Sequence, residues 1–180
     1  MKLKKAKKLT ISYKIKVKHF EDFLLLCSYD RADVDGFINL LSRCTEVDKE
    51  IFYNLKFADL IRFVDELVDS VDKEMYKAPK KAIKINDRYY KLIDLLNLQV
   101  AFYVDFDLVE KTPSYLLALC YTETGSYTGE RNTIVDEREK VMQNADVIDY
   151  MQLATFFLNW NNFLQKIKTK SKKNIVNLKR

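Results

Sequence analysis

A group of aspartates around one glycine is the pattern in this chain that comes nearest to a metal-binding loop. Asp30, Asp33 and Asp35 precede Gly36. A calcium loop of the helix–loop–helix type needs its glycine at the sixth place and a bidentate glutamate at the twelfth. With Gly36 at the sixth place, Ser42 stands at the twelfth, so the required ligand is missing. We therefore interpret the segment as an acidic turn that caps a helix beginning near Asp33.

Histidine and cysteine, the residues most often used as bases, nucleophiles and metal ligands, are few. The single histidine, His19, is framed by no Ser, Cys or Asp motif, so a boundary or surface position is expected. Cys27, Cys44 and Cys120 are odd in number, form no C-x-x-C pair and each lie in an apolar run. This pattern predicts three buried, reduced thiols. One histidine and three scattered cysteines predict no zinc site.

The remaining catalytic patterns are also missing. The acidic residues of 57–76 have helical spacing, but no histidine joins them, so a solvated helix face is expected. The sequence contains no glycine-rich phosphate loop, no nucleophile elbow and no zinc-protease motif. We therefore predict a protein that is not an enzyme, with no catalytic residue, no cofactor, no bound metal and no small-molecule substrate.

The composition determines which fold classes can position such residues. The chain has 180 residues, of which 48% are hydrophobic, and it contains only 3 Gly and 2 Pro. This length fits one domain, and the scarcity of turn residues argues against a β-sandwich or barrel. The predicted fold class is mainly α (α+β), a helical domain with a small β element.

The hydrophobic periodicity places the individual elements. Alternation of apolar residues with lysines predicts a strand near 9–17, and a turn at Asn86-Asp87 predicts a hairpin near 82–92. Thr45-Glu46-Val47-Asp48 resembles a capping box before a helical turn through Tyr53. Apolar residues at helical spacing predict further helices at 19–28, 33–44, 57–76, 95–111, 113–121, 133–143 and 146–167.

The charge is divided sharply along the chain and suggests three segments. Residues 1–18 carry eight Lys and residues 166–180 carry seven Lys and Arg, with no acid in either segment. Because the whole chain has a net charge of +5, the body at 19–165 carries −10. We predict a basic N-terminal segment with a strand (1–18), one acidic helical domain with the hairpin (19–165) and a basic C-terminal tail (166–180). The basic residues singled out are Lys4, Lys5, Lys7, Lys8, Lys168, Lys170, Lys172 and Lys173.

Basic ends on an acidic body allow three interpretations. The ends can neutralise nucleic-acid phosphates, dock on an acidic protein surface (including another copy of this chain), or add solubilising charge. The first interpretation is the weakest of the three, since Tyr13 is the only aromatic residue among the first 18.

Aromatic residues provide the candidates for protein contact. The segment 122–132 reads as one long loop with two of the three glycines, and Tyr121, Tyr127 and Thr128 flank those glycines. It is either a contact surface or a surface loop without such a role. The last helix contains Phe156, Trp160 and Phe163, and it is expected either to be central or to pack against a partner.

The order of several features resembles that of a known group of proteins. They are the Leu-rich turn Phe23-Leu24-Leu25-Leu26, the long helix Phe57–Met75, a lysine-proline linker into the hairpin Ile83–Tyr90, and the Phe-Phe-Leu-Asn-Trp helix at 156–160. Together they resemble small virion-associated and tail-region structural proteins of tailed bacteriophages, crAss-like phages in particular. The resemblance covers roughly residues 20–165, and residue usage rich in Lys, Asn, Tyr and Ile fits an AT-rich phage genome.

This resemblance implies a non-enzymatic virion protein of the tail or portal region, either a structural ring component or packaged cargo. It would act by contacts with other virion proteins or with copies of itself. A phage tail-assembly chaperone is the near alternative. A nucleic-acid-binding accessory factor that uses the Lys-rich ends is the second, and a protein that binds a host target is the third. The expected location is the virion after synthesis in the bacterial host cytoplasm, with no membrane involvement, since no apolar run is long enough to cross a bilayer.

Overall fold

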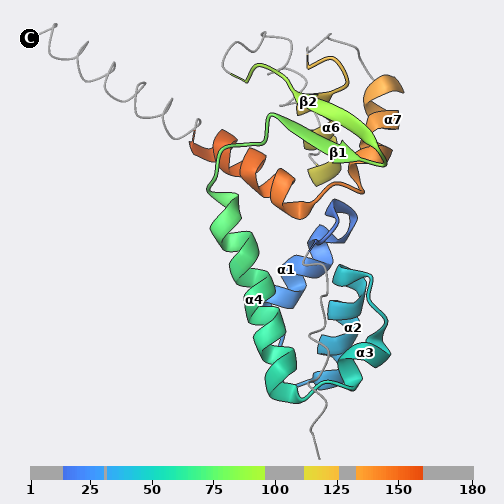
Figure 1. Ribbon diagram of the computed structural model, residues 1–180, viewed down its shortest axis with the longest axis vertical. Coiled ribbons are helices and arrows are strands. Elements are labelled where there is room, and N and C mark those ends of the chain that lie inside the picture. Colours follow the sequence, from blue (N-terminus) through green and yellow to red (C-terminus); the bar gives the residue numbers. More distant parts are fainter. Residues whose placement is uncertain (1–13, 31, 96–111, 126–132, 160–180) are drawn as a thin grey trace, which may run out of the picture.

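The computed structural model describes residues 14–30, 32–95, 112–125 and 133–159. In this part of the chain, helices dominate and a small three-stranded antiparallel sheet accompanies them (Figure 1). The predicted class, mainly α with a small β element, is therefore confirmed. The described helices and strands form two lobes, each with its own cluster of buried apolar side chains.

The first lobe consists of four helices that follow one another in the chain, and we call residues 20–75 the helical lobe. These helices are α1 (Phe20–Ser28), α2 (Val34–Thr45), α3 (Lys49–Tyr53) and α4 (Phe57–Met75). As predicted, α2 begins after Asp33, whose carboxylate accepts a hydrogen bond from the Gly36 N–H at 3.1 Å. This contact satisfies one of the donors that every helix leaves unpaired at its start.

The long helix α4 shows how spacing sets packing in this lobe. Its buried side chains recur at three- and four-residue intervals on one face, and they are Leu60, Val64, Leu67 and Val71. They belong to the same buried cluster as residues of α1 and α2, among them Phe37, which is completely buried. The acidic residues Asp65, Asp69 and Asp72 are exposed and Asp59 is half-buried, so the solvated face expected from the sequence is confirmed for this helix.

The second lobe is built around the sheet, and we call residues 82–95 and 112–142 the sheet lobe, as far as they are described. Its strands are β1 (Ala82–Ile85), β2 (Arg88–Leu92) and β3 (Tyr121–Thr122), in the order β1-β2-β3 with both pairings antiparallel. Asn86 and Asp87 form the predicted turn, with φ of 48° and 64°. Two positive φ values are those of a type I′ turn, whose twist suits a tight hairpin. Strand β3 was not predicted from the sequence.

Helices α6 (Pro113–Cys120) and α7 (Thr133–Met142) complete this lobe. Pro113 occupies the first turn of α6, as expected, and the Thr112 hydroxyl accepts a hydrogen bond from the Tyr115 N–H at 3.1 Å. The Glu139 carboxylate on α7 accepts hydrogen bonds from Thr112 and Ser114, which fixes the start of α6 against α7.

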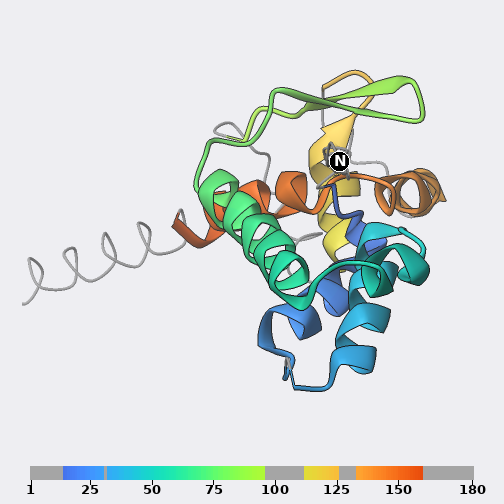
Figure 2. The ribbon, with the colours of Figure 1, turned by 60° about the horizontal axis from the view of Figure 1, so that its bottom comes forward.

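Besides the linker at 76–81, which runs from α4 to β1, two segments pack against both lobes, and we call them the bridging segments: residues 14–19 and residues 143–159. The first ends in the short 3₁₀ helix η1 (Val17–His19), and the second contains a helix at 147–159. They pair antiparallel, since the Val17 N–H donates to the Ala145 carbonyl at 2.9 Å and the Val147 N–H donates to the Ile15 carbonyl at 2.7 Å. In Figures 1 and 2 the β1–β2 hairpin and α2 lie at opposite ends of the molecule.

Each bridging segment contributes apolar side chains to both cores. Ile15 is buried in the core of the helical lobe, and Val17, two residues later, in that of the sheet lobe. In the same way, Val147 belongs to the first core and Leu153 to the second. The last helix is therefore central, which is one of the two alternatives that its aromatic content predicted.

Three local predictions need correction. Only Lys16 makes a strand-type bridge in the described part of the predicted strand at 9–17, and residues 9–13 lie outside the described residues. Asp48, not Thr45, caps α3, because the Asp48 carboxylate accepts from the Glu50 N–H while the Thr45 hydroxyl donates to the Leu41 carbonyl.

Cys27 is exposed, since α1 turns Phe23 and Leu26 toward the core and Cys27 away from it, whereas Cys44 and Cys120 are buried as predicted. The helix predicted at 95–111 lies almost entirely outside the described residues.

Candidate functional site: the cleft between the lobes

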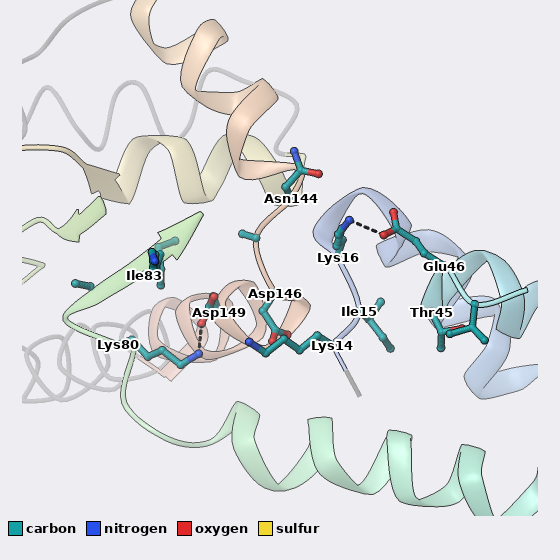
Figure 3. Close-up of a pocket in the computed structure, with 14 residues that line it drawn as sticks. Lys14, Ile15, Lys16, Thr45, Glu46, Lys80, Ile83, Asn144, Asp146 and Asp149 are labelled. Atoms are coloured by element: carbon teal, nitrogen blue, oxygen red, sulfur yellow. Dashed lines mark hydrogen bonds and ion pairs between the residues drawn. The ribbon is translucent and has the colours of Figure 1, made fainter. Parts of the chain in front are cut away.

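A cleft of about 520 Å³ opens where the two lobes meet the bridging segments (Figure 3). Its walls come from four separate stretches of the chain: residues 14–16, 45–47, 80–84 and 144–149. Charged side chains dominate the lining, and they are Lys14, Lys16, Lys80, Lys84, Glu46, Asp146 and Asp149. This volume is in the range of ligand-binding clefts, and the lining combines these seven charged side chains with apolar ones such as Ile15, Val47 and Ile83.

Lys80 and Asp149 form the best-buried ion pair of the cleft. The Lys80 Nζ lies 2.5 Å from a carboxylate oxygen of Asp149, whose side chain is only 7% exposed. The Tyr121 hydroxyl donates to the backbone carbonyl of Lys80 at 2.8 Å, so the lysine is fixed through its backbone as well. Burial raises the pKa of the Tyr121 hydroxyl, and the Asp149 charge raises it further, so this tyrosine stays protonated and donates.

Asp146 occupies the first position before the last helix and acts as its N-cap. One carboxylate oxygen accepts a hydrogen bond from the Ile148 N–H at 3.0 Å. Burial raises the pKa of the Asp146 carboxyl above its usual value, and the charge of Asp149 adds to this effect. The Ile148 N–H and the charges of Lys80 and Lys14 oppose the rise. Two carboxylates at a helix start interact favourably with its dipole, which gives this pair a structural role.

On the opposite wall, three basic side chains surround the Glu46 carboxylate. Lys16 and Lys18 reach it at 2.5 and 2.6 Å, and the His19 Nε2 lies 3.3 Å away. Hydrogen bonds from Lys16 and then Lys18 lower the pKa of Glu46 to about 2. Glu46 itself ends α2 in a left-handed conformation with φ of 55°. The first bridging segment is thereby attached to the end of α2 by charge.

Side chains that could act as a nucleophile or as a metal ligand are few in the described lining of the cleft. Among the described residues of the lining, Thr45 alone has a hydroxyl side chain, and that hydroxyl already donates to the Leu41 carbonyl at 2.7 Å. No histidine or cysteine lines the cleft to act as base or nucleophile. Among the described residues, no group of three or more His, Cys, Asp or Glu side chains is placed to hold a metal ion.

The predicted contact residues are spread over the molecule. Tyr121 is completely buried, because β3 pairs with β2 and turns this ring into the core of the sheet lobe. Tyr121 is therefore a core residue, and the prediction that it lies on a contact surface is wrong. Phe156 is half-buried against the same core, where its ring meets Phe157 edge-on with centroids 5.5 Å apart. The other candidates, Tyr127, Thr128, Trp160 and Phe163, lie outside the described residues, as do all the singled-out lysines of both basic ends.

The sequence did not point to the cleft. Lys80 and Asp149 are 69 residues apart, and no local pattern connects them. A first usable signal is the lysine-rich stretch before the hairpin, which includes Lys77, Lys80 and Lys81, but the sequence analysis interprets this stretch only as a linker. Asp146 and Asp149 had a second signal, since acids at the start of a predicted helix are typical of an N-terminal cap.

Comparison with known proteins adds no relative. No family model matches this chain, no curated protein matches it, and no solved structure matches it. Among the described helices, none is both long enough and apolar enough to cross a membrane.

Proposed function

We propose that this chain is a non-enzymatic bacteriophage virion protein of the tail or portal region that acts by contacts with other virion proteins or with copies of itself. The resemblance in the order of its elements supports the phage assignment. The observation that supports contact as the mode of action is the two-sided apolar character of α1. Phe23 and Leu26 face the core, while Leu24 and Leu25 on the other side are 49% and 55% exposed.

A short helix with apolar side chains on both faces is typically covered on both faces. The described part of the chain covers only one face of α1. Adjacent leucines on the outside of such a helix suit an apolar contact with a neighbouring subunit, because burying them removes apolar area from water. The exposed Cys27 on the same helix adds to this surface.

Mass spectrometry of purified virions of the source phage tests this proposal. The expected result is that the protein is present at a small, fixed copy number relative to the major capsid protein. A double variant, Leu24→Glu with Leu25→Glu, should lower incorporation, whereas the matched control Ile134→Glu should not, since Ile134 is an exposed apolar residue of the other lobe. Absence from virions, together with abundant protein in infected cells, would overturn the virion role and favour an assembly chaperone.

The basic ends favour a second candidate, a nucleic-acid-binding accessory factor. Together they carry 15 Lys and Arg without an acid. Phosphate binding weakens steeply with added salt because counterions are released on binding, while an apolar contact through α1 does not weaken in this way. A salt titration of complexes recovered from infected cells therefore separates the two candidates, and recovery of a host protein alone would indicate a host-directed factor.

A further inference from the structure

Strand β1 is an outer strand of the described sheet, which has the order β1-β2-β3. In a hairpin with a two-residue turn, the residues that flank the turn form a hydrogen-bonded pair, and such pairs then alternate along the strands. Ile85 and Arg88 flank this turn. The alternation therefore makes Ile83 and Tyr90 the next hydrogen-bonded pair.

The backbone beyond the hairpin agrees with this alternation. The Leu92 N–H donates to the Lys81 carbonyl at 2.9 Å, which is the next position in the same series. The N–H and carbonyl groups of Ala82 and Lys84 must then point away from β2. Within the part of the chain that the structure describes, no residue pairs with these groups, and in this part β1 presents an open backbone edge.

The cleft between the lobes reaches this edge. Ala82, Ile83 and Lys84 are consecutive residues, so their side chains point to opposite faces of the sheet, yet all three line the cleft. Because the Ile83 side chain is buried in the core of the sheet lobe, Ile83 lines the cleft through its backbone, and the cleft therefore meets β1 at its edge. An extended chain entering the cleft can therefore lie alongside β1 and pair with Ala82 and Lys84.

The charge around this edge selects the kind of chain that fits. Residues 77–91 contain six Lys and Arg and one acid. Lys80, Lys81 and Lys84 are all exposed on or beside β1. The acids of the cleft are engaged within the chain, because Asp149 binds Lys80, Glu46 binds Lys16 and Lys18, and Asp146 accepts from the Ile148 N–H. Lys84 binds Asp87 at 2.8 Å, but both side chains are exposed to solvent, so an acid of a partner can compete for Lys84. A second copy of β1 would bring its own lysines against these, and like charges on paired strands repel.

We propose that the open edge of β1 is a docking edge for an extended acidic segment of a partner protein, which adds a fourth strand to the sheet. The proposal rests on the proposed function as a protein that acts by contacts, and it names one contact surface and the chemistry of its partner.

The pattern of β1 also predicts the pattern of the partner segment. Ile83 and Ile85 are buried against the core of the sheet lobe, while Ala82 and Lys84 are exposed. Side chains of a paired strand follow the same alternation. A segment that fits would therefore alternate apolar residues on the side of Ile83 with acidic residues on the side of Lys84, over the four residues of β1.

The test uses the full chain and a peptide of alternating Val and Glu as the probe, with alternating Val and Lys as the control peptide. Binding is measured by fluorescence anisotropy of the labelled peptide. Amide hydrogen exchange measured by NMR then reports which backbone groups become paired. The expected result is that the acidic peptide binds, the basic peptide does not, and the N–H groups of Ala82 and Lys84 exchange at least tenfold more slowly in the complex.

Two variants separate charge from backbone pairing. Lys84→Glu should weaken peptide binding about tenfold, while Lys73→Glu, an exposed lysine on α4, should change it less than twofold. Ala82→Pro removes an outward N–H without removing a bond to β2, so the hairpin remains while binding falls at least fivefold. Ala82→Ser keeps the N–H and should bind as the original chain does.

Three outcomes would overturn the proposal. One is failure of the acidic peptide to bind at concentrations up to roughly millimolar. Another is binding that leaves the exchange of Ala82 and Lys84 unchanged. A third is tighter binding of a single-stranded oligothymidine that is lost with Lys84→Glu, which would assign the edge to nucleic acid. None of these outcomes affects the virion measurement, so failure of this proposal and failure of the proposed function remain distinguishable.

Discussion

The helical lobe and the sheet lobe each bury an apolar core, but the segments that form the two cores differ in how far apart they lie in the sequence. The helical lobe uses one continuous stretch, residues 20–75, in which each helix packs on its near neighbours. The sheet lobe combines a hairpin with α6, β3 and α7, which follow it at intervals along the chain. Contacts close in sequence cost less loop-closure entropy than distant ones. The comparison teaches that the sheet lobe is built from contacts of longer sequence separation than the helical lobe.

The largest expected effect comes from removing one core side chain in each lobe. Phe37→Ala in the helical lobe and Leu117→Ala in the sheet lobe both truncate completely buried residues. Each should lower the free energy of unfolding by about 3 kcal/mol or more, because a cavity remains. Urea unfolding followed by circular dichroism measures the loss, and the exposed Ile134→Ala is the control, with a change within about 0.5 kcal/mol.

Whether the two lobes unfold together is decided by the same experiment. Because the bridging segments contribute to both cores, we expect one cooperative transition with coincident probes in each variant. Two separate transitions would contradict this expectation and show that each lobe is stable without the other.

Substitutions in the first bridging segment should lower the free energy of unfolding by a smaller amount. Ile15→Ala and Val17→Ala each remove a buried side chain, Ile15 from the core of the helical lobe and Val17 from that of the sheet lobe. Each should cost roughly 1–3 kcal/mol, and Ile15→Ala should accelerate amide exchange first in α1 and α2. Hydrogen exchange by mass spectrometry measures this, with Val17→Ala as the matched variant for α6 and α7. Equal acceleration in both lobes for both variants would argue that the segment acts on the chain as a whole.

The ion pair between Lys80 and Asp149 should contribute less to the free energy of unfolding than these core side chains do. Lys80→Met leaves the Asp149 carboxylate, only 7% exposed, without its cation. We expect a loss of about 1–2 kcal/mol, since an unpaired buried acceptor is costly while the lysine itself is half exposed. A double-mutant cycle with Asp149→Asn measures the coupling. A coupling near zero would show that solvent replaces Lys80 without cost.

The smallest effect is the pH dependence of Glu46. Its pKa is lowered to about 2 in the folded chain by Lys16 and Lys18, so its contribution to stability is present above the unfolded pKa near 4.5 and is lost as the pH falls toward 2. The side chain is 38% exposed, and screening reduces the contribution to a few tenths of a kcal/mol. The difference in urea midpoint between the original chain and Glu46→Gln should therefore be measurable at pH 7 and vanish near pH 2. A difference that grows at low pH would have the wrong sign.

Prediction from the sequence succeeded where the signal was local. The stripe of α4, the Asp33 cap and the Asn86-Asp87 turn were all placed correctly, because each depends on residues within a few positions of one another. Strand β3 was missed because two residues carry no periodicity, and Tyr121 becomes a strand residue only by pairing with Leu92. The burial of Tyr121 and the exposure of Cys27 were missed for a related reason. Contacts between segments far apart in the sequence decide which side of each helix or strand faces the core.

The sequence by itself determined the mainly helical class, the position of the hairpin and the division between basic ends and an acidic body. These properties follow from composition, short-range periodicity and charge counts. Only the tertiary structure decided that two cores form, that the bridging segments serve both, and that Lys80 meets Asp149 in a cleft beside the open edge of β1. The physical reason is that burial, pairing and charge compensation depend on distances in space between residues far apart in the chain.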